Sequence, residues 1–582
     1  MSHSPHLFSL RIAHALSDAC AQERYTLTRL GQDVLAGITV GIIAIPLAMA
    51  LAIASGVAPQ HGLYTAIVAG FIIAMTGGSR YSVSGPTAAF VVLLYPIAQQ
   101  FGLAGLLLAT IMSGIILVAM AMLRLGRLIL YIPESVTLGF TAGIGVVIAT
   151  LQLKDFFGLK IEHMPEQYFS KLMALAQALP SLSFPSLLVA AITLSVMLLW
   201  PKLKIPVPAH LPAIAIGSVL ALMLNAVGAD IETIGTRFHY TLLDGSIASG
   251  IPSQFPHFDW PWLQTGANNQ PFVFNLVTFQ ALLPAAFAIA MLGAIESLLC
   301  AVVLDGMTGK RHSANSELLG QGIGNIITPF FGGIPATAAI ARSAANVKAG
   351  AQSPIAAMTH ALVVLIALVA LANILAYLPM SAMAALLLVV AWNMSEAPKA
   401  LHLVKTAPVS DVLVFFSCFS LTVIFDMVIA ISAGIILSAL LFMKEIAEMT
   451  KLYDISSNKR YVDQVLPEDW VVIKINGPLF FAAAERIFAE IASMTQDKQV
   501  IVLYLDGVSI LDAGGLAALN KLIDRCKKNH TKLIVADLQF QPIRTLARAK
   551  IQPIEGVLKF YPTLREALTE APPANPEILS EH

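Results

Sequence analysis

A stretch in the middle of the chain combines helix-breaking residues, small residues and one arginine. It begins with Gly332-Gly333-Ile334-Pro335, continues to Arg342, and lies inside a long apolar region. Glycine and proline interrupt a membrane-spanning helix, so the residues after them can restart as a half-helix. A half-helix points its unpaired N–H groups and its positive dipole end into the protein, where Arg342 adds a full charge. This pattern indicates an anion-binding site, and a kinked helix with a snorkelling arginine is the alternative.

A second stretch, earlier in the chain, has the same design. Ser84-Gly85-Pro86-Thr87-Ala88 also places breakers before small residues and an apolar run, and Pro86–Ala89 resembles Pro335–Ala339. Two interrupted hydrophobic segments at corresponding places in two halves of a chain are the best sequence sign of a transporter site built on inverted repeats. We therefore expect the two stretches to form one site.

The composition defines the elements that must hold these stretches. The 582 residues are 57% hydrophobic and 12% charged, with a formal net charge of zero, whereas a soluble chain carries about 25% charged residues. The composition predicts a polytopic α-helical membrane protein that lies in a lipid bilayer, and the absence of net positive charge argues against a nucleic-acid partner. The four cysteines show no spacing typical of a metal site or of a disulfide framework.

The distribution of charge predicts the domain organisation. We expect a cytoplasmic N-terminal segment at residues 1–32, a transmembrane domain at 33–445, a linker at 446–468, a second domain at 469–572 and a polar tail at 573–582. Lysine and arginine lie in alternate loops of the transmembrane domain, so both ends of the chain should be cytoplasmic. In the second domain, strands alternate with helices, which indicates a small α/β sheet. The second domain has no Gly-rich phosphate loop, and we expect no enzymatic reaction.

Several motifs of the chain resemble those of the sulfate permease (SulP) family of anion transporters. The first span carries Asp33-x-x-Ala36-Gly37, then Gly41 and Ile45-Pro46, and Gly85-Pro86-Thr87 and the Gly332–Ser343 stretch are similar to that family's third and tenth segments. The C-terminal domain resembles a STAS domain. Within the family, the resemblance is closest to a bacterial carrier of C4-dicarboxylates.

The resemblance implies a fold and a mechanism. We expect about fourteen segments arranged as two inverted repeats of seven, divided into a core and a gate. The anion would bind between the N-termini of the third and tenth segments, and the core would move against the gate in an elevator mechanism. Family members usually form homodimers, and the STAS domain can have a cytoplasmic protein partner.

Two departures from the family pattern limit what can be carried over. Many relatives have glutamine or glutamate after the first-span proline, where this chain has Leu47. The Asp-Ser-Ser-Gly pattern of related STAS proteins is replaced by Asp512-Ala513-Gly514-Gly515. Without the hydroxyl groups, phosphorylation cannot regulate this chain at that place.

Glu296 is the candidate coupling residue, because it lies in the otherwise apolar stretch Leu292–Leu304. A carboxyl group there is costly unless it is paired, protonated or facing a cavity, and burial favours the neutral form that a proton carrier must reach. The resemblance places the coupling-ion site on this helix, and the neighbouring Ser297 can add a hydroxyl group to it. A purely structural partner of Arg342 or of a backbone N–H is the alternative. The residues that we expect to contact the substrate are Leu47, Leu51, Gly85, Thr87, Ala88, Thr337, Ala339, Ile340, Ala341 and Arg342.

These observations predict a secondary active transporter of small anions in the bacterial inner membrane. We expect proton-coupled uptake of C4-dicarboxylates such as succinate, fumarate and aspartate, with no cofactor and no metal, and with sodium as the other possible coupling ion. A sulfate or bicarbonate transporter of the same fold is one alternative. An anion channel, or a membrane protein that signals through its STAS domain, is the other, although a channel needs no titratable group such as Glu296.

Overall fold

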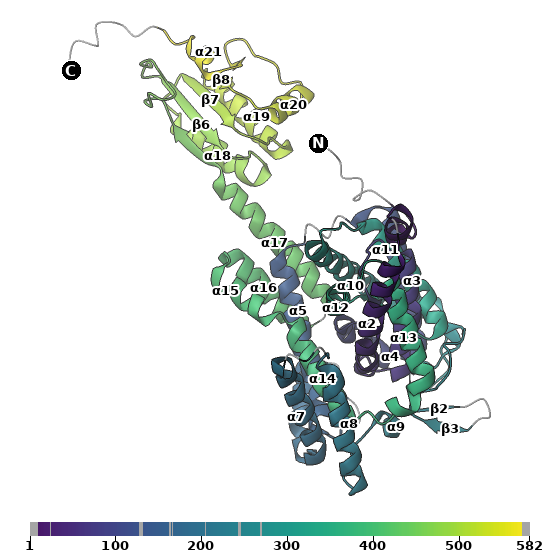
Figure 1. Cartoon of the computed structure of the whole chain (residues 1–582). Coiled ribbons are helices and arrows are strands. Elements are labelled where there is room, and N and C mark those ends of the chain that lie inside the picture. Colours follow the sequence, from purple (N-terminus) through teal and green to yellow (C-terminus); the bar gives the residue numbers. More distant parts are fainter. Residues whose placement is uncertain are drawn as a thin grey trace. The chain divides into compact units, whose positions relative to one another are not determined.

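The protein consists of two compact units in this computed structural model. The structure describes residues 10–572 except 24, 127–131, 162, 163, 166, 204, 206, 242–245, 268, 269 and 426. The first unit, here called the membrane unit, is Met1–Ile435, and the second, the C-terminal unit, is Ile436–His582. Helix α17 (Met427–Met449) belongs partly to each of them (Figure 1). The polar tail expected at 573–582 lies outside the described residues.

The membrane unit is built from two sets of seven segments, as the resemblance implied. The first set is α2 (Leu27–Ala54), α3 (Pro59–Thr76), the two parts of α4 (Ala88–Met122), α5 (Glu134–Phe157), α7 (Phe184–Leu199) and α8 (His210–Ala226). The second set is α10 (Leu276–Thr308), α11 (Ala314–Ile327), α12 (Ile340–Lys348), α13 (Ile355–Leu375), α14 (Met380–Met394), α16 (Val409–Ile424) and α17. In the described part of the chain, eight helices are long and apolar enough to cross a membrane. The prediction of a polytopic helical membrane protein is confirmed.

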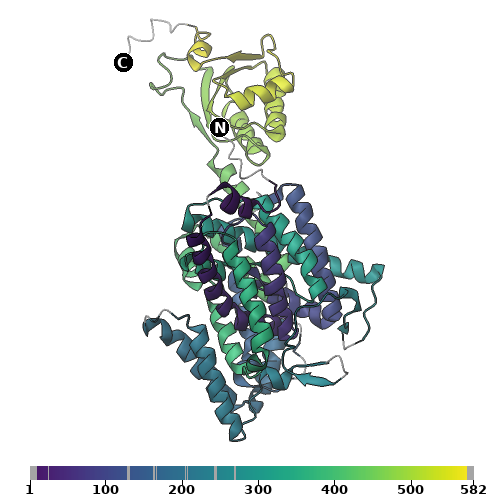
Figure 2. The same ribbon diagram turned by 45° about the vertical axis from the view of Figure 1, so that its right-hand side comes forward.

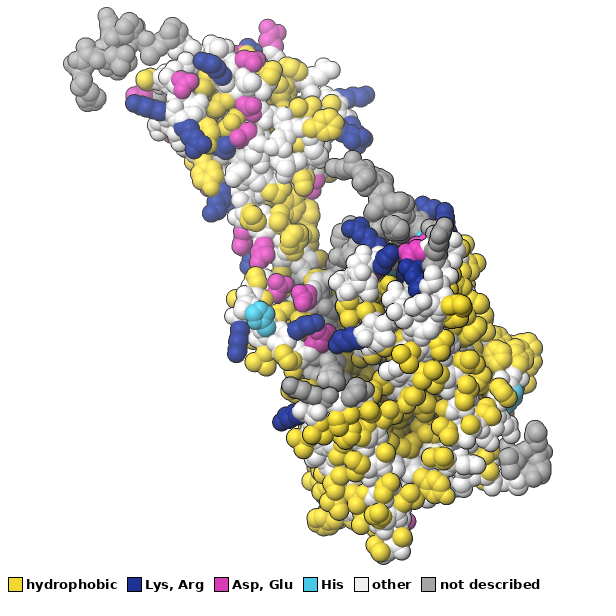
Figure 3. Space-filling view, viewed as in Figure 1, with side chains coloured by type: hydrophobic (Ala, Val, Ile, Leu, Met, Phe, Trp, Pro, Cys, Tyr) yellow, Lys and Arg dark blue, Asp and Glu magenta, His cyan; other side chains and the backbone are white. Residues whose placement is uncertain are grey.

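The segments gather into the two bundles expected for a core and a gate. In the core, α2, α3 and α4 pack against α10, α11 and α13, and Figure 2 shows the purple α2 and α3 beside the teal α13. In the gate, α5 packs against α14 and α16, while α7 packs against α8 and α14. Hydrophobic side chains cover most of the visible face of the membrane unit, with lysine and arginine gathered at one end (Figure 3).

A glycine divides α4 into two segments. Gly102 has φ 70° and ψ −169°, a conformation outside the helical region, and a Cβ atom there would lie 2.2 Å from the carbonyl carbon of Gly266. Only glycine adopts this backbone without strain and also leaves room for the neighbouring loop. The chain therefore turns at Gly102, and α4 forms two segments.

The long loop between α8 and α10 is attached to the connection between α13 and α14. This loop holds α9 (Ile234–Arg237), β2 (His239–Thr241) and β3 (Ile247–Ser249). The N–H groups of Ile234 and Met380 donate to the carbonyl groups of Leu378 and Glu232, each at 2.9 Å. Arg237 forms an ion pair with Asp155 at the end of α5, with 2.7 Å between Nη2 and Oδ1. The loop is thus held against the gate. The remaining short helices are α6 (Tyr168–Ala178) and α15 (Ala397–Thr406).

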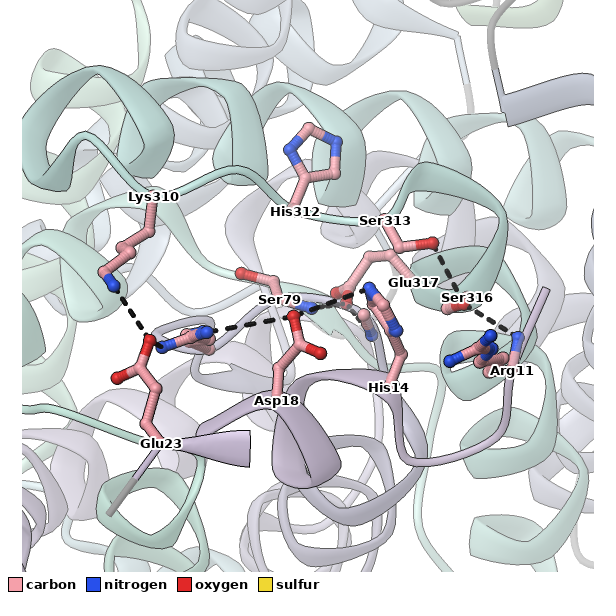
Figure 4. Close-up of polar contacts among 12 residues, drawn as sticks. Arg11, His14, Asp18, Glu23, Ser79, Lys310, His312, Ser313, Ser316 and Glu317 are labelled. Carbon is pink, nitrogen blue, oxygen red and sulfur yellow. Dashed lines mark hydrogen bonds and ion pairs between the residues drawn. The ribbon is translucent and has the colours of Figure 1, made fainter. Parts of the chain in front are cut away.

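The N-terminal segment is folded onto the core, and α2 begins at Leu27, earlier than the expected boundary at residue 33. The segment contains α1 (His14–Leu16) and a π-helical turn at Ser17–Gln22. The backbone N–H of Ala13 donates to the carbonyl oxygen of Thr76 at 2.9 Å. Glu23 accepts hydrogen bonds from Arg80 at 2.9 Å and from Lys310 at 2.8 Å (Figure 4). The segment therefore joins two loops of the core to each other.

The C-terminal unit is a five-stranded sheet with helices on both faces. The strand order is β5 (Lys451–Asp454), β6 (Trp470–Asn476), β7 (Val500–Gly507), β8 (Lys532–Ala536) and β9 (Leu558–Tyr561), with β5 antiparallel to β6 and the other pairs parallel. Helices α18 (Phe481–Met494), α19 (Ala513–Lys528) and α20 (Phe540–Arg548) cover one hydrophobic core, and α21 (Leu564–Leu568) covers the other.

The structure corrects the linker expected at residues 446–468. This region contains the end of α17 and strand β5, which pairs with β6 along its whole length. As an edge strand, β5 pairs with the sheet on one side only, and its burial pattern shows only Leu452 partly covered. Such a short and mostly exposed strand resembles a polar linker in sequence.

Candidate functional site

The two breaker stretches meet as a pair of short antiparallel strands. In β1 (Ser84–Gly85) and β4 (Thr337–Ala338), Ser84 is opposite Ala338 and Gly85 is opposite Thr337. Helix α4 begins directly after β1, with Thr87 as its N-cap residue, and α12 begins directly after β4, with Ala339 as its N-cap residue. Both helices therefore start inside the core, where their first N–H groups have no intrahelical acceptors. Their positive dipole ends suit a negative charge.

The guanidinium group of Arg342 lies against the first of these strands. Its Nη2 donates to the carbonyl oxygen of Pro86 at 2.7 Å, and a Cβ atom at Gly85 would lie 2.9 Å from Nη1. A side chain at position 85 would therefore have to displace the guanidinium group. A residue of α12 thus reaches the breaker stretch of the other repeat.

Arg342 retains unused hydrogen-bonding capacity. Its exposed fraction is 3%, and within the described residues neither Nε nor Nη1 has a partner. A buried donor without an acceptor is costly, and the cost is larger for a charged group. These two nitrogen atoms and the positive charge of the guanidinium are available for charge-assisted hydrogen bonds to an oxyanion. Chemically, this arrangement can accept hydrogen-bond acceptors that carry negative charge.

Glu296 faces the same site from α10. Its Oε2 atom accepts a hydrogen bond from the hydroxyl of Thr87 at 2.9 Å, so the carboxyl group lies beside the start of α4. The next residue, Ser297, lies 2.6 Å from the hydroxyl of Thr337, and its Oγ also accepts from the backbone N–H of Ala338 at 3.3 Å. Glu296 and Ser297 therefore contact β1–α4 and β4 respectively, which links α10 to both repeats.

The bonding partners of Glu296 and Arg342 bear on the alternative interpretation, in which Glu296 is a structural partner of Arg342 or of a backbone N–H. Arg342 donates to a backbone carbonyl, and Glu296 accepts from Thr87. Among the described residues, no ion pair joins the two side chains. A guanidinium and a carboxyl group that face one site without bonding to each other can each bind something else, an anion at the guanidinium and a proton at the carboxyl group.

The other expected site residues occupy three kinds of position. Gly85, Ala88 and Thr337 are buried beside the strand pair. Ala339 is half-buried, and Ile340 and Ala341 are exposed on the first turn of α12, where an ion could reach the backbone. Leu47 is half-buried and Leu51 buried, one turn apart on α2, which packs against α12. They can supply only apolar surface.

Sequence reasoning overlooked polar residues that support the site. Gln321 and Asn325 on α11 are completely buried and bond to the two breaker stretches. Their sequence signal was a spacing of four residues within an apolar helix, which places them on one face. His360 on α13 is also fully buried, and neither ring nitrogen has a partner in the described part of the chain.

Comparisons with known proteins agree on one family. The profile of the sulfate permease family matches residues 30–418, and that of the STAS domain matches residues 461–567. YvdB of Bacillus subtilis, whose name marks it as a candidate sulfate transporter, is 37% identical over 519 residues, which cover 89% of this chain and 93% of that protein. The bicarbonate transporter BicA of Picosynechococcus sp. is 25% identical over 543 residues, covering 89% and 90%. The solved structure of SLC26A9 superimposes with a TM-score of 0.81 at 19% identity, covering 96% of this chain and 92% of that one.

Proposed function

The chain belongs to the sulfate permease family of anion transporters, with a C-terminal STAS domain, and from this premise we propose that it carries out proton-coupled uptake of C4-dicarboxylates. The protein is a transporter rather than an enzyme. The anion would bind at the N-termini of α4 and α12, and the proton at Glu296. The core would move past the gate in an elevator mechanism, with the protein as a homodimer in the bacterial inner membrane and both termini in the cytoplasm.

One observation supports this proposal most strongly. The buried guanidinium of Arg342 has two free donors at the place where two half-helices begin. One carboxylate of a C4-dicarboxylate can accept charge-assisted hydrogen bonds from these donors. The second carboxylate would extend toward the half-helix N-termini, where unpaired N–H groups favour negative charge.

Glu296 supports proton coupling. In an apolar site the carboxylate and a bound dianion would repel each other, so a loaded crossing is easier with the neutral acid. The Thr87 hydroxyl donates a hydrogen bond to Glu296, and Thr87 is also the N-cap residue of α4. Thr87 would therefore lie beside both the bound anion and the bound proton. Sodium is the alternative coupling ion.

The second candidate function is transport of sulfate or bicarbonate, as the names of the relatives suggest. The guanidinium and the two helix N-termini suit any small oxyanion. A channel is less well supported, because a passive pore needs no titratable carboxyl group beside the site.

Uptake into proteoliposomes tests the proposal. Radiolabelled succinate, sulfate and bicarbonate would be offered separately to the purified full chain under an imposed proton gradient, an imposed sodium gradient or no gradient. We expect concentrative uptake of succinate with the proton gradient only. Concentrative uptake of sulfate or bicarbonate without succinate uptake would show that the substrate is an inorganic anion rather than a dicarboxylate. Uptake that depends on the sodium gradient would show that sodium, and not the proton, is the coupling ion. Uptake that never exceeds equilibrium would favour a channel.

A further inference from the structure

Helix α11 carries a buried stripe of polar side chains. Glu317, Gln321 and Asn325 follow one another at intervals of four residues, which places them on one face of the helix. Each has an exposed fraction of 1% or less. Burying polar groups in an apolar bundle is costly unless each one forms hydrogen bonds. The partners of these three side chains are therefore informative.

The first two side chains of the stripe bond to different non-helical parts of the core. Glu317 accepts hydrogen bonds from the backbone N–H groups of Gly78 at 3.0 Å and Ser79 at 2.9 Å (Figure 4). Gln321 donates through Nε2 to the Ser84 hydroxyl at 3.0 Å and to the Glu317 carboxyl at 3.3 Å. Both therefore hold the chain that leads into α4.

Asn325 bonds within its own repeat, to the chain that leads into α12. Its Nδ2 donates to the carbonyl oxygen of Ala336 at 3.0 Å, and its Oδ1 accepts from the N–H of Ala336 at 2.8 Å. Ala336 directly precedes β4, whereas Ser84 is the first residue of β1. One helix face therefore holds both strands that lead into the half-helices.

The helix that carries the stripe is itself tightly fixed. A Cβ atom at Gly320 would lie 2.5 Å from the Cα of Gly77, and one at Gly324 would lie 2.4 Å from Cγ1 of Ile73. On the α4 side, a Cβ atom at Gly322 would lie 2.7 Å from Cγ2 of Val118. The three glycines let α11 approach α3 and α4 closely, so α11 has little room to slide or rotate.

The strand pair needs such support. Each strand has only two residues, and a two-stranded ladder of this length is not stable alone. The pairing fixes the strands relative to each other, but lateral bonds are needed to fix them relative to the core.

We propose that Gln321 and Asn325, anchored by Glu317, are positioning residues that set the separation of the two half-helix N-termini and thereby the affinity and selectivity for the anion. This inference rests on the proposed function, since it takes the anion to bind between those ends. The residues act through Ser84 and Ala336 and do not contact the anion. A stripe that served packing alone would affect stability and leave affinity unchanged.

The test compares three variants of the full chain in proteoliposomes with radiolabelled succinate, sulfate and bicarbonate as probes. Gln321→Met removes the donor with little change of volume, Ser84→Ala removes the acceptor, and the double variant removes both. Thr110→Val is the matched control, because Thr110 is fully buried on α4 and its hydroxyl bonds within its own helix, to the carbonyl oxygen of Leu106 at 2.7 Å.

We expect Gln321→Met and Ser84→Ala each to raise KM by about 3- to 10-fold, the factor that corresponds to one hydrogen bond, and to change the ratio of KM values among the transported anions. The double variant should change KM no more than the stronger single variant, because both remove the same bond. Thr110→Val should lower thermal stability while KM and the ratio stay at wild-type values.

Two outcomes would overturn the inference separately from the proposed function. Wild-type uptake with unchanged KM values in both single variants would assign the stripe to packing. If Gln321→Met does not fold, the test rests on Ser84→Ala alone, because this variant leaves the Gln321–Glu317 bond in place. An unchanged KM in Ser84→Ala would then also assign the stripe to packing. A wild-type protein that takes up none of the three anions would instead overturn the proposed function, and this inference with it.

Discussion

Arg342 combines two properties that rarely occur together in one residue. It is almost completely buried, yet two of its donors have no partner in the described part of the chain. Its hydrogen bond to the carbonyl oxygen of Pro86 keeps the guanidinium beside the start of α4. A bond to a neutral acceptor holds the side chain in position without cancelling its charge, so the full charge stays available to a ligand.

Arg342→Ala should weaken anion binding by roughly 1–3 kcal/mol, about 5- to 150-fold in Kd, because it removes a charge-assisted contact. Arg342→Lys should fall between the alanine variant and the wild type, since it keeps the charge but loses the planar fork. Isothermal titration of the detergent-solubilised protein with succinate, sulfate and bicarbonate would measure both effects. An unchanged Kd in a folded Arg342→Ala protein would mean that the arginine only supports the helix.

Glu296→Gln should separate exchange from accumulation. Glutamine has the shape of the neutral acid and keeps an oxygen that accepts from Thr87, so binding and anion exchange should persist. Accumulation driven by a proton gradient should be lost, because the side chain no longer binds a proton. Counterflow and gradient-driven uptake measure the two activities in the same proteoliposomes.

Two other results would contradict the coupling role of Glu296. A variant that still concentrates succinate, with the pH dependence of the wild type, would exclude Glu296 as the coupling group. Joint loss of exchange, uptake and folding would show that the carboxyl group is structural.

At the scale of elements, the sequence was most informative where local chemistry decides the structure. Glycine and proline marked both interruptions, and the alternation of strands and helices indicated the C-terminal sheet. The pairing of β1 with β4 could not be predicted, because two residues per strand carry no pattern and the partners lie about 250 residues apart. The hydrogen bond between Thr87 and Glu296 could not be predicted either, because it depends on how α4 and α10 pack against each other.

Gly102→Ala should destabilise the membrane unit by roughly 1–3 kcal/mol or more, because the native backbone is strained for any residue with a side chain. The new methyl group would also collide with Gly266. Gly306→Ala on α10 is the matched control, since a Cβ atom there would meet no atom of a neighbouring element within 4 Å, and it should be neutral or slightly stabilising. Thermal unfolding of the two variants in the same detergent compares them. Equal melting temperatures would contradict the role given to Gly102.

The N-terminal segment should detach from the core in acid. Hydrogen bonds from Lys310 and Arg80 hold the pKa of Glu23 at about 2, below its ordinary value of 4.5. A lowered folded-state pKa contributes stability that is complete above the ordinary value and is lost as the pH falls toward 2. Hydrogen exchange at residues 13–22, corrected for the intrinsic rate, should therefore lose protection between about pH 5 and about pH 2.

Glu23→Gln serves as the control for this effect. The variant should show weaker protection of the same residues at neutral pH and a smaller change on acidification, because the ionisable partner is gone. Protection that is identical in variant and wild type at every pH would show that the backbone bonds of Ala13 and Ala15 hold the segment alone.

At the scale of the whole molecule, each unit has its own hydrophobic core and matches its own family profile. All residues that face the candidate site belong to the membrane unit, and the C-terminal sheet is closed by its own helices. The sequence predicted this division from the change in charge near Lys444. It misplaced the start of the sheet, because β5 is short and half of its residues are charged.

Truncation after Met449 should leave a protein, the membrane unit with the rest of α17, that still binds the anion. The cut lies between α17 and β5, so no strand of the sheet remains unpaired. We expect the Kd for the anion to change by less than about threefold, while the rate of uptake can fall. Titration of the truncated protein with the transported anion gives the answer. Loss of binding by a truncated protein that remains monodisperse and helical would show that the site needs more than the membrane unit.

The strand pair also has a consequence for how the gene can change. β1 comes from the first repeat and β4 from the second, and Ser84 and Gly85 are opposite Ala338 and Thr337. Neither repeat forms the site alone, so a mutation in one is tolerated only if a residue encoded hundreds of codons away accommodates it. Across homologous genes, the residues at positions 84 and 338, and those at 85 and 337, should therefore covary. Chimaeras that join halves from distant relatives should lose anion binding even when both halves insert into the membrane.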